Sequence, residues 1–128
     1  MNPIKPPIKA DDRGDAVANL QAALLFLLDR DVTLFFDPLE TPAPDQLKVI
    51  KEALLVEETA KLFDKTTREL TAAFQRRQGL APQVKGAVDQ TTADALNDRL
   101  RQHGALDDNR TFAVKGQVLR TGTSEPQP

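Results

Sequence analysis

One helix-start pattern occurs twice in this sequence, and it limits the folds open to the chain more than any other feature. The pattern is an apolar residue, then Asp, then Thr three positions after the Asp; it reads FDKTT at 63–67 and VDQTT at 88–92. The Asp carboxylate can accept hydrogen bonds from the free amides of a first helical turn, and the preceding apolar residue can pack back on that helix. The repeat therefore places two helix starts, and we assign Asp64 and Asp89 a structural role rather than a catalytic one.

Apolar residues spaced three and four apart predict four helices in all. The first is expected over 15–28, capped by Asp12 or Asp15. The second follows a proline-rich break, with Asp45 as its cap and an end that the spacing leaves open. The third is expected over 64–78 and the fourth over 89–103, and each is followed by a glycine that can end a helix in the left-handed conformation.

The segments around these helices have other patterns. Three prolines stand in residues 1–8, which predicts an extended lead-in. Three more lie in 29–44, where we expect a loop with apolar anchors and a short strand over 32–36. Residues 111–121 alternate with the period of a strand, and 122–128 form a tail of small, polar and proline residues that should be disordered.

The fold class expected from these patterns is all-α: a small three-helix bundle with an extra inserted helix and loop, and a C-terminal extended strand or tail. Residues 9–106 would form the helical domain, with an insertion at about 29–60. Residues 107–128 would be a linker whose strand either begins a following domain or docks on the helices. With 128 residues and 14.1 kDa, the chain has room for one core and needs neither disulfides nor a structural metal.

The residue inventory disfavours most hydrolytic and metal chemistry. The chain has no cysteine and a single histidine, His103, so thiol catalysis, cysteine-bound zinc and histidine-based sites lack their usual residues. Adjacent acidic residues such as Glu57 and Glu58 do not face each other on a helix, which disfavours a glycosidase pair. We expect no enzyme activity, no cofactor and no metal, and we interpret His103 as a cation at a helix C-terminus.

Charge and hydropathy restrict the partners. Lys and Arg number 17 against 19 Asp and Glu, so no basic excess favours nucleic acid. The longest apolar stretch is far short of the roughly 20 residues that span a bilayer, and the N-terminus has no hydrophobic signal region. We therefore expect a monomer that is cytoplasmic as synthesised, with no membrane insertion, and that reaches a cell wall only by a non-classical export route.

Three blocks of the sequence, in order, resemble the peptidoglycan-binding-domain-like family. They read RGDAVANLQAAL at 13–24, FDKTT followed by AFQRRQGL at 63–80, and GAVDQTTADAL at 86–96. The resemblance covers about 9–106 and implies a three-helix bundle that binds peptidoglycan without catalysis. The segment FAVKGQV at 112–118 is similar to the first strand of a carboxypeptidase-regulatory-like β-sandwich module, which implies a larger multidomain protein.

The candidate binding residues follow from the ligand chemistry. The chain has no Trp and no Tyr on which a sugar ring could stack, so the stem peptide of peptidoglycan, with its carboxylates, is a better ligand than the glycan. Arginine binds carboxylates through two parallel hydrogen bonds. The candidates for a shared polar rim are Arg13, Gln21, Arg76, Arg77 and Gln78. The competing interpretation is structural: the arginines would be solvated helix-end cations, and Gln21, like Gln75, would satisfy loop backbone groups.

Three functions remain open from the sequence. The first is a non-catalytic, N-terminal cell-wall-binding module of a larger bacterial protein. The second is a protein–protein assembly module of a large delivery or toxin-like protein, which would use Leu34, Phe35 and Phe36 of the 29–44 loop as an exposed apolar contact. The third is a folded spacer with neither ligand nor partner.

Overall fold

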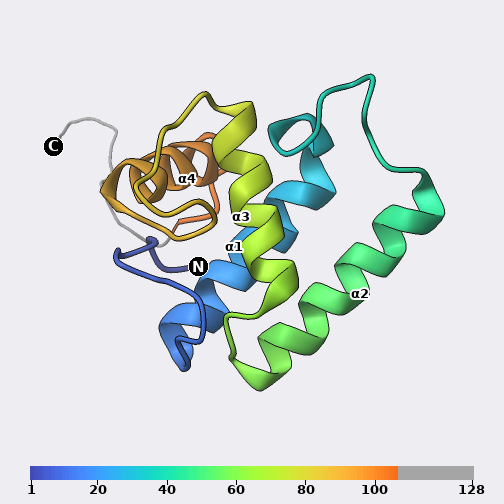
Figure 1. Cartoon of the computed structure of the whole chain (residues 1–128). Coiled ribbons are helices and arrows are strands. Elements are labelled where there is room, and N and C mark those ends of the chain that lie inside the picture. Colours follow the sequence, from blue (N-terminus) through green and yellow to red (C-terminus); the bar gives the residue numbers. More distant parts are fainter. Residues whose placement is uncertain (107–128) are drawn as a thin grey trace, which may run out of the picture.

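The computed structural model describes residues 1–106, which form a small bundle of helices (Figure 1). The elements in chain order are α1 (Asp15–Arg30), the short 3-10 helix η1 (Val32–Leu34), α2 (Pro44–Ala60), α3 (Lys65–Arg77) and α4 (Gln90–Gln102). Within 1–106 the only β pairing is two isolated bridges. The all-α prediction with one inserted helix is therefore confirmed, whereas the strand and tail expected within 107–128 lie outside the described residues.

The core is built around α1. Its residues Leu20, Leu24 and Leu27 have no exposed surface, because α1 passes behind α3 with α4 on one side and α2 on the other (Figure 1). The two helices that start with the repeated pattern, α3 and α4, each present one narrow apolar stripe to this core. Phe74 of α3 and Leu96 of α4 are likewise fully buried.

A buried glutamine joins α3 to the turn before α4. The Gln75 Nε2 donates to the Ala87 carbonyl at 2.7 Å and to the Thr92 hydroxyl at 3.0 Å, and its Oε1 accepts from the Gly86 amide at 2.9 Å. Gly86 has a φ of +86°, and a Cβ there would lie 2.6 Å from Arg68 Cγ, so this position requires glycine. One side-chain amide thus satisfies three polar groups that α4 and its turn would otherwise leave buried and unpaired.

The same arrangement recurs between α1 and α3, with one bond missing. The Gln21 Nε2 donates to the Leu62 carbonyl at 2.8 Å and to the Thr67 hydroxyl at 2.9 Å. Its Oε1, however, is buried without a hydrogen-bond partner among residues 1–106. The residue six before Thr67, which corresponds to Gly86, is Lys61, and its amide instead donates to the Glu58 carbonyl at the end of α2. The inserted helix has therefore taken the donor that the first glutamine would need.

Helix α2 also caps α3. The Glu57 carboxylate accepts from the Thr66 amide at 2.8 Å, the Thr67 amide at 2.9 Å and the Thr67 hydroxyl at 2.7 Å. Partial burial opposes ionisation of Glu57, but these hydrogen bonds outweigh it and hold the pKa of the carboxyl below its usual value. In α4 the N-cap Asp89 does the equivalent work itself by accepting from the Thr92 amide, and the pKa of Asp89 is lowered by its bonds to Thr92.

The N-terminal segment, residues 1–8, forms no helix and packs into the bundle. Ile4 and Ile8 are buried, and Ile8 exchanges two backbone hydrogen bonds with Val88, the residue before the α4 cap. The buried Asn97 of α4 accepts from the Ile4 amide at 2.7 Å and donates to the Ile4 carbonyl at 3.0 Å. The N-terminal segment is therefore tied to α4 along its length.

Several predicted local details were wrong. The N-cap of α1 is Gly14 rather than Asp12 or Asp15, because Asp12 instead accepts from the Lys9 amide and Asp15 lies inside the first turn. Helix α2 is capped at Ala43, one residue before Pro44, and not at Asp45. Residues 32–36 form no strand, since Val32–Leu34 coil into η1. The starts of α3 and α4 at Asp64 and Asp89 are confirmed.

Gln75 makes three hydrogen bonds and Gln21 makes two, so substitution of Gln75 should destabilise the protein more. Methionine has nearly the volume of glutamine but cannot form these hydrogen bonds, so Gln75→Met should lower the free energy of unfolding by about 2–3 kcal/mol. Gln21→Met should cost about 1 kcal/mol less, because it also removes an oxygen that already lacks a partner. Urea denaturation of both variants measures the difference, and an equal or larger loss for Gln21→Met would contradict the account.

The Glu57 cap predicts a pH-dependent contribution to stability. Because the pKa of Glu57 is lower in the folded protein than the 4.5 of an unperturbed glutamate, the cap stabilises the protein above about pH 4.5 and is lost as the pH falls through the lower, folded value. Glu57→Gln should cost about 1 kcal/mol at pH 7 and progressively less below pH 4.5 in denaturation curves. Glu58→Gln is the matched control and should show neither effect; a pH-independent difference for Glu57→Gln would refute the assignment.

Candidate functional site

A groove lies between α2 and α3. It has a volume of about 520 Å³, within the range of small-ligand sites. The two helices meet where Glu57 caps α3 and diverge toward the other end (Figure 1). Its lining residues are Phe36, Val49, Ile50, Ala53, Lys65, Thr66, Glu69, Leu70, Ala72, Ala73 and Arg76.

The residues that α2 and the loop after η1 contribute to the groove are apolar and uncharged. Val49, Ile50 and Ala53 come from α2, and Phe36 enters from the loop after η1. Helix α2 has only Leu54 fully buried, and Leu47 and Ile50 are partly buried against the core. Lys51 also forms an ion pair with Asp29 of α1 at 2.7 Å. Because α2 packs along one stripe, Val49 on the groove side stays largely exposed.

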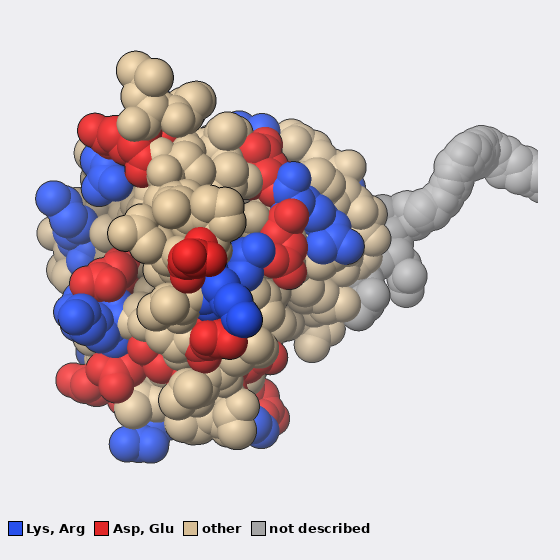
Figure 2. Space-filling view, turned by 90° about the vertical axis from the view of Figure 1, so that its right-hand side faces the viewer, with Lys and Arg blue, Asp and Glu red and all other residues tan. Residues whose placement is uncertain are grey.

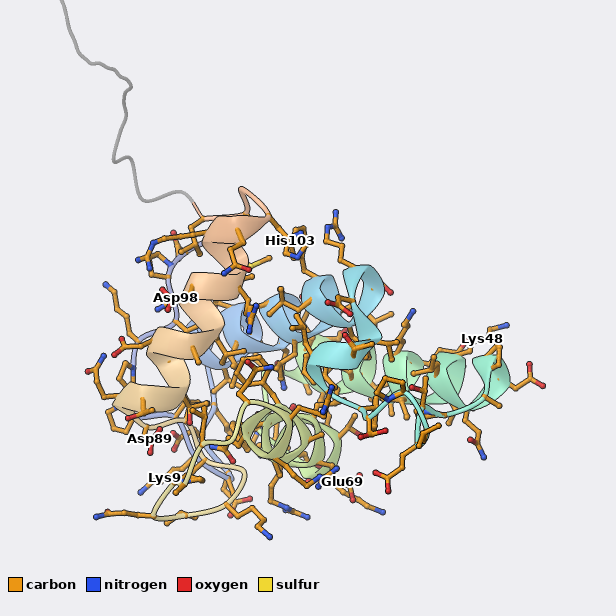
Figure 3. The ribbon with its side chains drawn as sticks, turned by 90° about the horizontal axis from the view of Figure 1, so that it is seen from above. Lys9, Lys48, Glu69, Asp89, Asp98 and His103 are labelled. Carbon is orange, nitrogen blue, oxygen red and sulfur yellow. The ribbon has the colours of Figure 1, made fainter. Side chains whose placement is uncertain are left out.

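The α3 side of the groove carries all of its charge. Lys65, Glu69, Ala72 and Arg76 are spaced four, three and four apart and therefore share one helix face. The three charged side chains are exposed and form no hydrogen bond or ion pair within residues 1–106. Seen from above, Glu69 projects from α3 on the side of the molecule opposite His103 (Figure 3). The groove therefore offers a positive, a negative and a positive group in order along one wall.

The surface around α2 has no dominant sign of charge. In the view that faces α2, lysine and arginine alternate with aspartate and glutamate among uncharged residues (Figure 2). Such a surface does not set up the single-sign field that attracts a polyanion. It suits a ligand that itself carries both signs of charge.

Three of the candidate residues, Arg76, Arg77 and Gln78, lie together at the C-terminal end of α3, but their side chains make different contacts. Arg76 lines the groove. The Nε of Arg77 donates to the Thr33 carbonyl at 3.0 Å and so holds η1, and the Gln78 Oε1 accepts from Arg99 of α4 at 2.9 Å. Only Arg76 of this group is both exposed and free of a partner in the described range.

The other two candidates lie elsewhere. Arg13 forms a β-bridge with Leu62, so it sits at the N-terminal end of α3, about 18 Å along this 13-residue helix from Arg76. Gln21 has no exposed surface and serves as the internal link described above. The structure therefore does not join Arg13, Gln21 and Arg76 into one rim, because α1 begins where α3 begins and not where α3 ends.

The apolar loop and the histidine are also used internally. Leu34 and Phe35 are buried, with the Phe35 ring centroid 5.8 Å from that of Phe74, and Phe36 lines the groove. Leu34 and Phe35 therefore cannot form the exposed apolar contact that the sequence analysis expected of this loop. His103 lies edge-on to Phe26 at the end of α4, with ring centroids 6.1 Å apart. Residues 1–106 hold no group of three or more His, Cys, Asp or Glu side chains placed to bind a metal ion.

Lys65 and Glu69 were not among the candidates from the sequence. Their spacing with Ala72 and Arg76 is visible there, but a polar helix face is usually solvated. The groove exists because of the position of α2 relative to α3. The spacing of apolar residues within a single helix does not predict that position. The chemistry that these residues offer is ion pairing and apolar contact with a bound chain.

The comparisons with known proteins do not identify a family for this chain. None of the helices in the described range is long and apolar enough to cross a membrane. No protein-family model matches the chain. Neither the curated proteins nor the solved structures that were compared with it gave a match.

Proposed function

We propose that this domain is a non-catalytic module that binds peptidoglycan through its stem peptides, and that the groove between α2 and α3 is the contact site. The observation that carries the proposal is the unpaired Arg76 in the wall of a groove whose other wall is apolar. A stem peptide presents small methyl groups along its length and carboxylates at its end. The groove offers a complement to both.

The small residues of the groove support a peptide rather than a sugar ligand. Ala53, Ala72 and Ala73 leave space for methyl side chains near Ile50 and Leu70, where apolar contact contributes about 25 cal/mol per Å² buried. The Arg76 guanidinium can bind a carboxylate through two parallel hydrogen bonds. Phe36 is the single aromatic residue among the described residues that line the groove, and it lacks the polar handle of Tyr or Trp.

In its matching blocks, the sequence resemblance covers the three helices α1, α3 and α4 and the links between them, but not helix α2, which forms one wall of the groove. Its first two blocks contain Gln21 and Gln75, the two glutamines that link the helices, and the second and third contain the Thr residues that those glutamines bind. Helix α2 lies between the first and second blocks and supplies one wall of the groove. The proposed contact site is therefore specific to this chain's insertion.

Removal of the Arg76 charge should weaken wall binding. In co-sedimentation with insoluble peptidoglycan sacculi at low salt, Arg76→Ala should raise the apparent Kd about tenfold, because a hydrogen bond to a charged group contributes about 1.5–3 kcal/mol. Arg13→Ala removes the same charge at the far end of α3 and should leave the Kd unchanged. High salt should weaken wild-type binding toward the Arg76→Ala level. Equal loss in both variants would show a nonspecific charge effect and contradict the assigned site.

A second candidate function rests on the outer side of α2. Leu55 and Val56 are 45% and 70% exposed there, and Val49 is 64% exposed at the groove edge. Such residues on one helix favour a contact with another protein in an assembly. Wild-type protein that fails to pellet with sacculi at any salt concentration would favour this second function over the first.

A further inference from the structure

We infer that the groove recognises the order of charges along its ligand: a peptide that carries an ammonium group between two carboxylates, with the ammonium at Glu69. This inference rests on the proposed function and names the part of the stem peptide that would be read, a diamino acid whose side-chain amine is free. The observation behind it is the alternation of Lys65, Glu69 and Arg76 along one wall.

The three charges are placed as a linear array. They share one face of α3, and at 1.5 Å of rise per residue Glu69 lies about 6 Å from Lys65 and about 10 Å from Arg76 along the axis. An extended peptide advances about 3.3 Å per residue, so these intervals correspond to about two and about three residues of a bound chain. A short peptide thus reaches all three groups at once.

The charged groups of Lys65, Glu69 and Arg76 are available to a ligand because they form no ion pairs with one another. Lys65 and Glu69 stand four residues apart yet form no ion pair, and Arg76 has no acidic partner among residues 1–106. The facing wall of α2 contributes Val49, Ile50 and Ala53 and no charge. The α3 wall alone therefore sets the direction and register of the peptide.

A carboxylate between two cations also discriminates among ligands. A peptide with carboxylates only would meet Glu69 in the middle of the groove, where like charges repel. A peptide with its ammonium blocked would leave Glu69 without a partner next to apolar surface. Glu69 is therefore the specificity-determining residue of the array, and Lys65 and Arg76 provide affinity for carboxylates.

The test uses three synthetic, N-acetylated hexapeptides with a glutamate at position 1, a diamino acid at position 3 and alanine at the other positions. One has a free side-chain amine and a free C-terminal carboxylate; the second has the amine acetylated; the third has the C-terminus amidated. Binding to the full chain is measured by isothermal titration at low salt. For the wild type, acetylation should raise Kd about tenfold, and amidation should do the same through the loss of the Arg76 contact.

Glu69→Gln completes the cycle. It should weaken binding of the free-amine peptide about tenfold and leave the acetylated peptide unaffected, so that the two changes are not additive. Glu52→Gln, an exposed carboxylate of α2 that does not line the groove, is the matched control and should change neither Kd. Circular dichroism of each variant checks that the helices are intact.

The outcomes separate the two proposals. If the free-amine peptide binds and acetylation has no effect, or if Glu69→Gln weakens both peptides equally, the charge-order inference is overturned while stem-peptide binding stands. If no peptide and no sacculi bind the wild type, the proposed function itself fails. Tenfold, non-additive losses at Glu69 and at the amine support both.

Discussion

Two buried glutamine amides hold this small domain together, and the rest of its architecture depends on them. Gln21 and Gln75 each reach from one helix to the carbonyl and hydroxyl groups at the start of the next repeated helix. Buried polar groups in a chain of this size are costly when unpaired, so each amide makes its turn and helix start energetically acceptable. The helices α1, α3 and α4 thereby form one frame from two similar linkages.

The inserted helix modifies that frame where it joins it. The end of α2 takes the Lys61 amide that Gln21 would otherwise bind and leaves the Gln21 Oε1 unpaired. In return, the Glu57 carboxylate caps α3 with three hydrogen bonds. The Glu57 cap joins α2 to α3 at this end, and beyond it the two helices diverge with the groove between them (Figure 1). The candidate site is thus a consequence of how an extra helix is tied to a three-helix frame.

Local signals in the sequence predicted the frame well and the groove not at all. Asp64 and Asp89 were identified as helix starts because a carboxylate there satisfies neighbouring amides, and both are N-caps in the structure. Gly79 and Gly104 were identified as stops because glycine readily adopts the left-handed conformation, and both have positive φ. The caps at Gly14 and Ala43 were missed, since neither residue carries a capping side chain.

The binding residues were predicted less completely, for a related physical reason. A charged residue on a helix face has the same local pattern whether it faces solvent or a groove, so Lys65 and Glu69 gave no distinguishing signal. The sequence analysis grouped Arg13 and Gln21 with Arg76 as one polar rim. The structure separates them, because the start of α1 lies beside the start of α3 and not beside its end. Only the packing of α2 against α1 and α3 distinguishes these positions.

The most direct test of the central claim is to map the ligand contact on the domain itself. Two-dimensional amide NMR spectra of the labelled protein would be recorded during titration with a soluble stem peptide released from peptidoglycan. The account predicts shift changes confined to 49–53 of α2 and 65–76 of α3, with residues 8–19 unchanged. Changes centred on Arg13 and the start of α1, with the α2 and α3 amides unaffected, would contradict it.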